Sequence, residues 1–387
     1  MKKRPRVALL IETSNSYGRG LLRGIHAYAR DHGPWSTYLP EQGRGDPPPG
    51  WLKNWKGEGI IARIENRRIA EAIGRLKLPV VDVSAARALP STPWVETDDE
   101  VIVRLAVDHL IERGFKHFAF CGDARFAWSK LRCAAMVQLL ATTGRSCHTI
   151  EVGAALSKTA KPVSEEAQLT RWLKKLPRPI GIFACYDIRG HQLLEICRRN
   201  DIAVPEHVAV LGVDNDELLC ALADPPLSSI APDTRRTGYV AAELLDRMMR
   251  GEIVPAEPHL VRPLDLITRQ STDVLAVDDP YVVQAARFIR EHACDGVNVE
   301  DVLTRVPLTR RALECRFKKL LGRTPHDEIQ RVQLRRVEQL LKETDLPISA
   351  IADRAGYKYG EYLSVAFKRK YGITPGEYRA AAKNLLR

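Results

Sequence analysis

The fold is decided by the stretch Pro347–Tyr378, which reads PISAIADRAGYKYGEYLSVAFKRKYGITPGEY. Four apolar residues in its first part follow the i, i+3, i+4, i+7 spacing of a helix with one buried face. They are Ile348, Ile351, Ala352 and Ala355. Gly356 is expected to end this helix, and a second helix begins a few residues later. Two short helices joined by a tight glycine-containing turn are typical of a helix-turn-helix, which presents its second helix to the major groove of DNA.

A second copy of this pattern lies 50 residues upstream, where FKKLLGRTP at Phe317–Pro325 aligns with FKRKYGITP at Phe367–Pro375. The apolar residues before it, Val299, Val302, Leu303 and Val306, repeat the spacing of the first helix. This internal repeat predicts two helix-turn-helix units. Between them, Thr324–Lys342 is expected to form one helix, and its nineteen residues span roughly 28 Å. Because neighbouring major-groove faces lie about 34 Å apart, such a spacer can set two recognition helices into successive grooves.

Residues from about Asp279 to Arg387 resemble the DNA-binding domain of the AraC/XylS family of bacterial transcription regulators, chiefly through ADRAGY and FKRKYGITPGEYR. The resemblance implies two recognition helices, Thr309–Leu320 and Glu361–Tyr371. Glu361, Leu363 and Pro307 depart from the residues usual in that family.

The outward faces of these two helices supply the expected DNA contacts. In the first helix Thr309 is the expected N-cap, and Arg310, Arg311 and Glu314 are candidates for reading bases. Their counterparts in the second unit are Lys358, Glu361, Ser364 and Val365. Phosphate anchors are expected at Lys318, Lys319, Lys368, Arg369 and Lys370. Contact with the DNA backbone alone is the alternative for Arg310 and Arg311.

The charge distribution agrees with a DNA partner. The whole chain carries a net charge of +11. Residues 280–387 hold 21 Lys/Arg and 13 Asp/Glu, a net of +8, which leaves +3 for the other 279 residues. Basic charge concentrated in the domain with the repeats favours double-stranded DNA as its partner.

The eight cysteines show no CxxC spacing, so neither a zinc site nor a disulfide framework is predicted, and no metal ligands are assigned. Cys121 and Cys185 end apolar runs and are expected to be buried thiols in a reducing cytoplasm. The apolar run after the basic start, in MKKRPRVALLIE, is too short for a signal peptide or a membrane span. The expected location is therefore cytoplasmic, without a membrane partner.

From Arg6 to about Thr272, short apolar runs alternate with helical patterns. The expected strands are Val7–Ile11, Gly59–Ala62, Pro79–Val83, His117–Cys121, Ile180–Cys185, Val208–Val213 and Leu260–Ile267. This alternation predicts an α/β sensor of two doubly wound parallel-sheet lobes, followed by an all-α domain. The expected boundaries are 1–272 for the sensor, 273–279 for a linker and 280–387 for the DNA-binding domain.

Ligands of open parallel sheets bind beyond the carboxyl ends of the strands, where this chain has four polar loops. A sugar is held there by carboxylates, Arg and Asn, with an aromatic ring against its C–H face. Residues of these types in the loops are Asp187, Asp214, Asn215, Arg132 and Trp128. Each has a structural alternative. Asp214 could form a capping box with Glu217, Asp187 could be an N-cap, Arg132 could face solvent and Trp128 could close the core.

The motifs GIFACYDIRG, VAVLGVDNDE, PPLSSIAPD and HLVRPLDLITRQST resemble the sugar-binding core shared by LacI-type repressors and periplasmic sugar-binding proteins. Combined with a C-terminal AraC-type domain, this core resembles the regulators of xylose operons over essentially the whole chain. That resemblance implies ligand contacts for Tyr17 and Arg19, although Arg19 could instead pair within its own helix. The resemblance to LacI-type cores implies a ligand contact for Arg132.

The expected function is therefore a DNA-binding transcription regulator of a sugar-utilisation operon, acting as an activator. The expected effector is xylose or a related pentose, with no cofactor, and the regulator is expected to be a homodimer that works with RNA polymerase. The first alternative keeps this architecture with a hexose, another sugar or a nucleobase as effector. A remote third is a cysteine-based DNA-repair enzyme, which the dispersed cysteines disfavour.

Overall fold

The computed structural model describes residues 4–43, 46–153, 164–273 and 279–384. The chain divides into two compact units, Met1–Asp273 and Val274–Arg387. Most of the expected linker 273–279 lies outside the described residues.

Within the described residues, the first unit contains two six-stranded sheets, one in each of two lobes. The sheet of the N-terminal lobe has the order β11-β5-β4-β3-β1-β2. Its strands are β1 (Arg6–Leu10), β2 (Ser36–Tyr38), β3 (Gly59–Ala62), β4 (Val80–Asp82), β5 (Trp94–Thr97) and β11 (Pro258–Val261). The lobe also contains α1 (Ser16–His32), the 3-10 helix η1 (Gly50–Asn54), α2 (Arg67–Gly74) and α8 (Thr234–Met249). Its neighbouring strands pair in parallel.

The sheet of the C-terminal lobe has the order β12-β10-β9-β8-β6-β7. Its strands are β6 (His117–Asp123), β7 (Cys147–Val152), β8 (Ile180–Ala184), β9 (Val208–Val213), β10 (Ser228–Ala231) and β12 (Asp265–Ile267). Its helices are α3 (Asp99–Glu112), α4 (Ala127–Thr142), α5 (Glu165–Lys175), α6 (Asp187–Arg199), α7 (Glu217–Leu222) and the 3-10 helix η2 (Gln270–Thr272). β12 pairs antiparallel with β10, whereas the other strands pair in parallel. The predicted two-lobed doubly wound architecture is confirmed.

The single strand expected at Leu260–Ile267 is wrong. The chain forms β11 and β12 there, and they belong to different sheets. Pro263 lies between them and has no N–H to donate, so it suits a break in a strand. The sequence patterns also missed β2, β5, β7 and β10. These strands are exposed, short or polar, whereas the strands that were predicted are largely buried on both faces.

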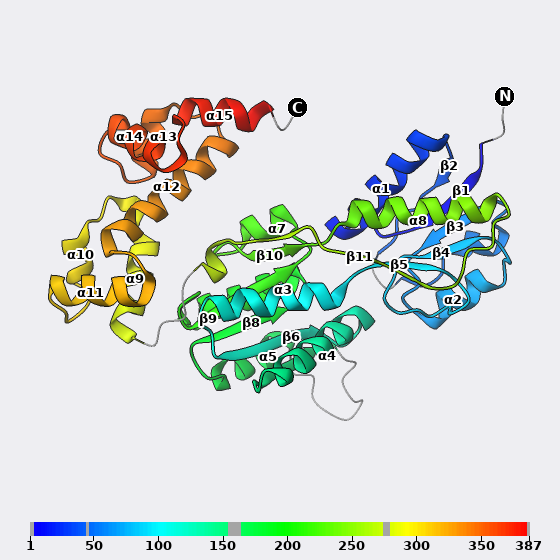
Figure 1. Cartoon of the computed structure of the whole chain (residues 1–387), viewed down its shortest axis with the longest axis horizontal. Coiled ribbons are helices and arrows are strands. Elements are labelled where there is room, and N and C mark those ends of the chain that lie inside the picture. Colours follow the sequence, from blue (N-terminus) through cyan, green and yellow to red (C-terminus); the bar gives the residue numbers. More distant parts are fainter. Residues whose placement is uncertain (1–3, 44–45, 154–163, 274–278, 385–387) are drawn as a thin grey trace. The chain divides into compact units, whose positions relative to one another are not determined.

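The chain passes between the lobes at three places: from β5 to α3, from β10 to α8 and from β11 to β12. The second crossing returns α8 to the N-terminal lobe, where it lies beside α1 (Figure 1). Two glycines permit this close approach. A Cβ added to Gly24 would lie 2.0 Å from the carbonyl oxygen of Arg235, and one added to Gly238 would lie 2.0 Å from that of Leu21.

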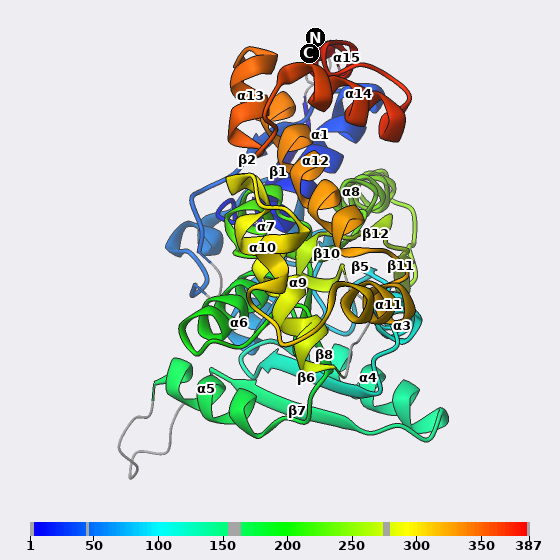
Figure 2. The same ribbon diagram turned by 90° about the vertical axis from the view of Figure 1, so that its left-hand side faces the viewer.

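The second unit is helical throughout its described elements. They are α9 (Pro280–His292), the 3-10 helix η3 (Ala293–Asp295), α10 (Val299–Leu303), α11 (Arg310–Leu321), α12 (Pro325–Glu343), α13 (Ile348–Arg354), α14 (Gly360–Tyr371) and α15 (Pro375–Asn384). The nineteen-residue helix α12 runs from the group α9–α11 to the group α13–α15 (Figure 2). It begins after Thr324, which forms a capping box with Asp327. The predicted pair of helix-turn-helix units joined by one helix is confirmed.

The repeat is also exact at the ends of the recognition helices. α11 and α14 each have twelve residues, and they end at Gly322 and Gly372 with φ of 70° and 78°, a conformation that glycine adopts without strain. In the middle of α12, the Gln333 side-chain amide donates to the carbonyl oxygen of Ala293 at 2.9 Å and to that of Gly356 at 3.3 Å. This buried amide therefore connects η3, which precedes the first helix-turn-helix, to the turn of the second.

The end of the first unit is anchored in the core of the C-terminal lobe. Ser271 and Thr272 are fully buried. The Thr272 hydroxyl lies 2.7 Å from His109 Nε2, and the Thr272 carbonyl accepts a hydrogen bond from Arg113 Nε at 2.7 Å. Burial, assisted by the charge of Arg113, lowers the pKa of His109 from 6.5 to about 3.

This buried histidine predicts a loss of stability in acid. His109 stays neutral in the folded protein down to about pH 3, whereas the unfolded chain takes up its proton below pH 6.5. The free energy of unfolding of the first unit should therefore fall by about 2 kcal/mol between pH 8 and pH 5 through this residue. All six tryptophans lie in the first unit, so urea unfolding followed by tryptophan fluorescence measures it selectively.

His109→Gln should remove this part of the pH dependence, because glutamine can still hydrogen-bond to Thr272 but takes up no proton. His117→Gln, at an exposed histidine that begins β6, is the matched control and should follow the wild-type curve. Identical pH profiles for His109→Gln and the wild type would contradict the assignment.

Candidate functional site

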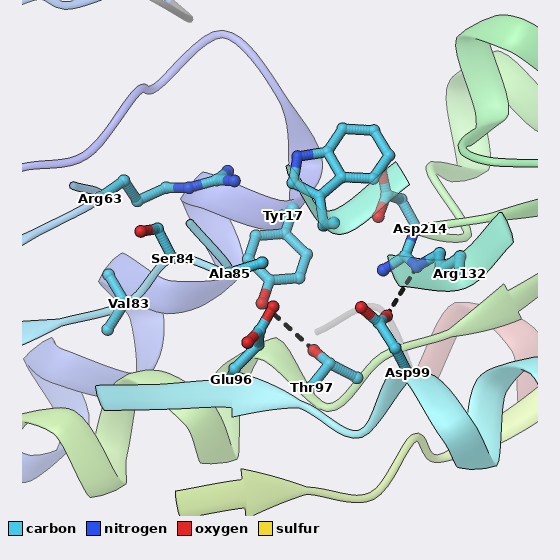
Figure 3. Close-up of a pocket in the computed structure, with 11 residues that line it drawn as sticks. Tyr17, Arg63, Val83, Ser84, Ala85, Glu96, Thr97, Asp99, Arg132 and Asp214 are labelled. Atoms are coloured by element: carbon cyan, nitrogen blue, oxygen red, sulfur yellow. Dashed lines mark hydrogen bonds and ion pairs between the residues drawn. The ribbon is translucent and has the colours of Figure 1, made fainter. Parts of the chain in front are cut away.

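A pocket lies between the two lobes of the first unit, at the carboxyl ends of their strands (Figure 3). It holds about 420 Å³ of space, counted out to its open mouth. The N-terminal lobe contributes the lining residues Tyr17, Arg63, Val83, Ser84, Ala85, Glu96 and Thr97, and the C-terminal lobe contributes Asp99, Trp128, Arg132 and Asp214. Polar groups converge on this space from both lobes, an arrangement typical of a small-molecule site.

Arg132 is the buried cation of the pocket, with 5 % of its surface exposed. Its Nε donates to Asp99 Oδ1 at 2.6 Å, and its Nη1 donates to the carbonyl oxygen of Cys185 at 2.7 Å. Burial by itself would lower the pKa of Arg132, but the nearby carboxylates of Asp99 and Asp214 together have the larger effect and raise it overall. The guanidinium therefore remains charged. The solvent-facing alternative for Arg132 is therefore wrong, and this side chain is a fixed hydrogen-bond donor inside the pocket.

Two aromatic side chains form apolar surfaces of the pocket. The Trp128 ring stacks on Phe126, with centroids 5.1 Å apart and planes at 12°, and it lies 5.2 Å from the Arg132 guanidinium carbon. Across the pocket, the Tyr17 hydroxyl lies 3.2 Å from Thr97 Oγ1. Burial raises the pKa of Tyr17 to about 12, which keeps its hydroxyl neutral and able to donate.

Arg63 follows β3 directly and already has two carboxylate partners in the protein. Its Nη1 donates to Glu12 Oε1 at 2.6 Å and its Nη2 donates to Glu65 Oε1 at 2.5 Å. Its guanidinium lies 5.2 Å from the centre of the Tyr17 ring. Since Glu12 and Glu65 balance its charge, Arg63 adds no free positive charge to the pocket.

The carboxyl groups of Glu96, Asp99 and Asp214 outnumber the cations available to a ligand. Burial raises the pKa of Glu96 to about 8, and it also raises the pKa of Asp99 despite the contact with Arg132. These groups can accept hydrogen bonds from hydroxyls, and Arg132 can donate to an oxygen. The arrangement therefore suits a neutral molecule rich in hydroxyl groups.

Four of the seven expected ligand residues line the pocket: Tyr17, Trp128, Arg132 and Asp214. The suggested capping box of Asp214 with Glu217 is wrong, because the N-cap of α7 is Asp216, whose carboxylate accepts from the Leu219 N–H. Asp214 has a positive φ of 110°, which is uncommon for a residue with a side chain. Such a strained position at a strand end is typical of a functional site.

The other three expected ligand residues are outside the lining. Asp187 is fully buried, and its carboxylate accepts from the Ser229 hydroxyl at 2.6 Å and the Asp216 N–H at 2.8 Å. Asn215 accepts at its side-chain oxygen from Arg269 at 2.8 Å. Arg19 is exposed and donates to the carbonyl oxygen of Thr13, with its Nη2 3.8 Å from Asp216 of the other lobe. These three residues support the strand-end loops instead of forming the pocket wall.

Reasoning from the sequence missed the pocket residues of β3, β4 and β5, chiefly Arg63, Ser84, Glu96, Thr97 and Asp99. The sequence did contain a signal that could have identified Arg63, because this charged residue directly follows the fully apolar strand Gly59–Ala62. Glu96, Thr97 and Asp99 could not be found in this way because β5 was not predicted as a strand.

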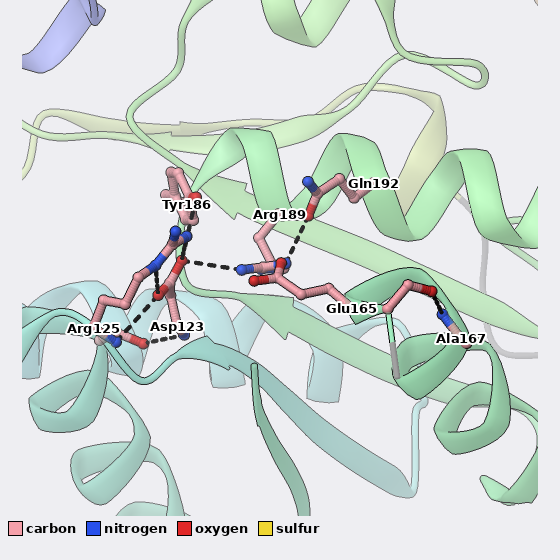
Figure 4. A network of polar contacts seen from close by, with 9 residues as sticks. Asp123, Arg125, Glu165, Ala167, Tyr186, Arg189 and Gln192 are labelled. Atoms are coloured by element: carbon pink, nitrogen blue, oxygen red, sulfur yellow. Dashed lines mark hydrogen bonds and ion pairs between the residues drawn. The ribbon is translucent and has the colours of Figure 1, made fainter. Parts of the chain in front are cut away.

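An ion network centred on the buried Asp123 supports the pocket from the C-terminal lobe (Figure 4). Asp123, at the end of β6, is fully buried and binds Arg125 at 2.6 Å and Arg189 at 3.0 Å. Burial alone would raise the pKa of Asp123, but the hydrogen bonds from Arg125 lower it overall. Arg189 also binds Glu165 at 3.0 Å. The same network reaches Tyr186, whose ring centre lies 5.5 Å from that of Trp128, so it holds the aromatic wall in place.

The first recognition helix, α11, exposes the residues predicted to contact DNA. Thr309 is its N-cap and accepts from the Ala312 N–H. Arg310 is paired with Glu300 at 2.7 Å and with Glu314 at 3.1 Å, whereas Arg311 and Lys318 are exposed on the helix surface. An Arg310 in this state must exchange protein carboxylates for DNA before it can read a base.

The second recognition helix, α14, exposes Lys358, Glu361, Val365, Lys368 and Arg369 on or next to its outer face. Ser364 is half-buried and donates to the carbonyl oxygen of Gly360 at 2.9 Å. Arg369 donates to Gln330 of α12 at 3.0 Å. Leu363 and Phe367 are fully buried.

Cys121 and Cys185 are fully buried, which confirms their predicted placement. Burial raises the pKa of the Cys185 thiol to about 12, so this thiol is not a ready nucleophile. Among the described residues, no group of His, Cys, Asp and Glu side chains has the arrangement of a metal site. In the same part of the chain, no helix combines the length and apolar character needed to cross a membrane.

Comparison with known proteins identifies both units. Residues 6–100 match the XylR N-terminal domain, residues 107–272 match the periplasmic binding protein-like domain, and residues 302–381 match a helix-turn-helix domain. The xylose operon regulatory protein of Escherichia coli strain K12 is 35% identical, with 97% of each chain covered. That of Haemophilus influenzae is 33% identical, with 97% of this chain and 98% of that protein covered.

A solved structure agrees with these sequence relatives. The structure of a xylose-binding transcription activator, XylR, superposes with a TM-score of 0.83 at 33% identity and covers 98% of this chain and 99% of that chain. A periplasmic binding protein/LacI regulator from Alkaliphilus metalliredigens, complexed with D-xylulofuranose, has a TM-score of 0.56 at 20% identity over 69% of this chain, and shows the fold of the sensor unit. The sequence repeat, the two-lobed sensor and these relatives lead to one conclusion: the chain belongs to the family of xylose operon regulatory proteins.

Proposed function

We propose that this protein is a transcription activator of a sugar-utilisation operon whose effector is a neutral, unphosphorylated pentose, xylose or a close relative. The observation that carries the proposal is the pocket between the lobes, in which carboxyl groups outnumber the available cations and a tryptophan forms one wall. The similar regulators are named for the xylose operon, and the similar solved structure is that of a xylose-binding activator. The relatives support the sugar class, and the pocket chemistry supports a neutral ligand.

In the proposed complex, Asp214 and Asp99 accept hydrogen bonds from sugar hydroxyls, Arg132 donates to a sugar oxygen, and Trp128 packs against the C–H face of the ring. Because the pocket is built from both lobes, a bound sugar stabilises their closed arrangement. A sugar can then change DNA binding only to the extent that it binds one arrangement of the protein more tightly than another.

At the DNA, α11 and α14 are proposed to enter successive major grooves, held apart by α12. The protein is proposed to act in the cytoplasm as a homodimer that recruits RNA polymerase, with DNA and sugar as its ligands and no catalytic step of its own. The length of α12 and the pairing of two recognition helices of equal length support this mode of binding.

The first test is Asp214→Asn. Asparagine tolerates the positive φ of this position but lacks the charge, so the variant should fold normally and bind the sugar about 10- to 100-fold more weakly. Isothermal titration with D-xylose measures this loss, and other pentoses, hexoses, sugar phosphates and nucleobases form the comparison panel.

Glu217→Gln is the matched control, because Glu217 is an exposed carboxylate three residues away that does not line the pocket. It should bind the sugar as the wild type does. Unchanged sugar affinity in Asp214→Asn would reject the proposed contact, and preferential binding of a sugar phosphate would reject the proposed ligand class.

The second test separates base reading from phosphate contact in α11. A duplex selected from a random pool by the wild-type protein is titrated with Arg311→Ala and Lys318→Ala. Arg311→Ala should relax the preference at one base pair by about 1–3 kcal/mol. Lys318→Ala should weaken binding to all sequences evenly and reduce the slope of log affinity against log salt by about one. An even loss across all sequences in Arg311→Ala would make that residue a phosphate anchor.

A further inference from the structure

The outer face of α14 carries an exposed apolar patch, formed by Tyr359, Tyr362 and Val365. Their surfaces are 51 %, 64 % and 69 % exposed. Tyr362 and Val365 are three residues apart and therefore neighbours on one helix face. The rings of Tyr359 and Tyr362 lie 5.7 Å apart, so the patch is continuous. Single exposed apolar residues are common, but a cluster on one helix face indicates a binding surface.

The equivalent surface of α11, all of which the structure describes, has no such patch. With the 50-residue offset of the repeat, Thr309, Ala312 and Cys315 stand where α14 has Tyr359, Tyr362 and Val365. At the two positions between them, α11 has Arg311 and Glu314 where α14 has Glu361 and Ser364. The two helices have the same length and matching ends, yet one presents charged groups and the other presents apolar groups.

The charges around the patch indicate what covers it. Lys358, Lys368 and Arg369 are exposed next to it, and the Lys358 ammonium lies 5.6 Å from the centre of the Tyr359 ring. This basic border suits the phosphates of duplex DNA. In the major groove, the apolar group that a base pair offers is the 5-methyl of thymine, which aliphatic and aromatic side chains contact.

We propose that the two recognition helices read different base compositions: Val365, with Tyr362 beside it, contacts thymine methyl groups, whereas Arg311 and Glu314 of α11 read G·C pairs. The inference rests on the proposed DNA binding and adds the specificity-determining residues. It makes the binding site asymmetric, with one thymine-dependent half and one half that depends on hydrogen bonds to guanine and cytosine.

Uracil substitution tests the proposal, because replacing thymine by deoxyuridine removes only the methyl group. In a duplex selected by the full-length protein, each thymine is replaced in turn, and affinity is measured by fluorescence anisotropy. With the wild type, uracil at one or two positions in a single half-site should weaken binding about fourfold for each methyl group removed. Val365→Ala should weaken binding to the thymine duplex and show no further loss with uracil at those positions.

Cys315→Ala is the matched control, since residue 315 is the equivalent position of α11, and it should keep the full uracil effect. Val365 is exposed, so thermal unfolding should be the same for Val365→Ala and the wild type. Equal uracil effects in Val365→Ala and the wild type would overturn the proposal, as would selected duplexes insensitive to uracil, which would leave the patch to a protein partner. Failure of the wild type to retain any duplex would instead reject the proposed function itself.

Discussion

The sensor unit depends on one constraint: the parallel strands of a sheet all end at the same edge. The carboxyl-end edges of the two lobes' sheets face each other across the pocket. The chain crosses between the lobes three times, so neither sheet is completed by a continuous segment of sequence. This arrangement brings Tyr17, Glu96, Arg132 and Asp214 to one pocket, although they come from distant parts of the chain. It also makes the pocket sensitive to the relative position of the lobes, which is the property that a ligand-controlled regulator needs.

The electrostatics of this gap are set mainly by pairs within the protein. Arg63 is balanced by Glu12 and Glu65, and Arg132 is bound to Asp99. A buried pair of this kind adds little net stability, but removing one partner leaves a charge that water cannot reach. The pairs therefore fix the orientation of hydrogen-bonding groups before the ligand arrives, which reduces the entropy lost on binding. The ion network around Asp123 has the same effect on the aromatic wall.

The DNA-binding unit uses duplication in place of a pocket. Two units whose recognition helices have the same length and glycine ends are joined by α12. Gln333 donates to the backbone carbonyl of Ala293, just before the first unit, and to that of Gly356, in the turn of the second. Leaving either buried carbonyl without a partner would cost free energy, so this amide favours one relative orientation of the two recognition helices. The shared backbone framework then leaves their exposed side chains free to differ.

The sequence by itself determined the elements whose signals are local. The period of the apolar residues predicted the buried face of α13, and the 50-residue repeat predicted the second helix-turn-helix. The apolar runs predicted β1, β3, β6, β8 and β9. Four of the pocket residues could also be predicted from the sequence, because ligands of open parallel sheets bind at the polar loops that follow the strands.

Tertiary structure decided the rest. β5 and β10 are short and partly polar, so only pairing with neighbouring strands makes them strands, and Glu96 and Thr97 enter the pocket with β5. Asp187 and Asn215 have the right chemistry at the right strand ends. Yet Ser229 and Asp216 donate to the two carboxylate oxygens of Asp187, and Arg269 donates to the side-chain oxygen of Asn215. Whether a polar side chain serves a ligand or its own fold depends on which partners the fold brings within about 3 Å, and those partners are distant in the sequence.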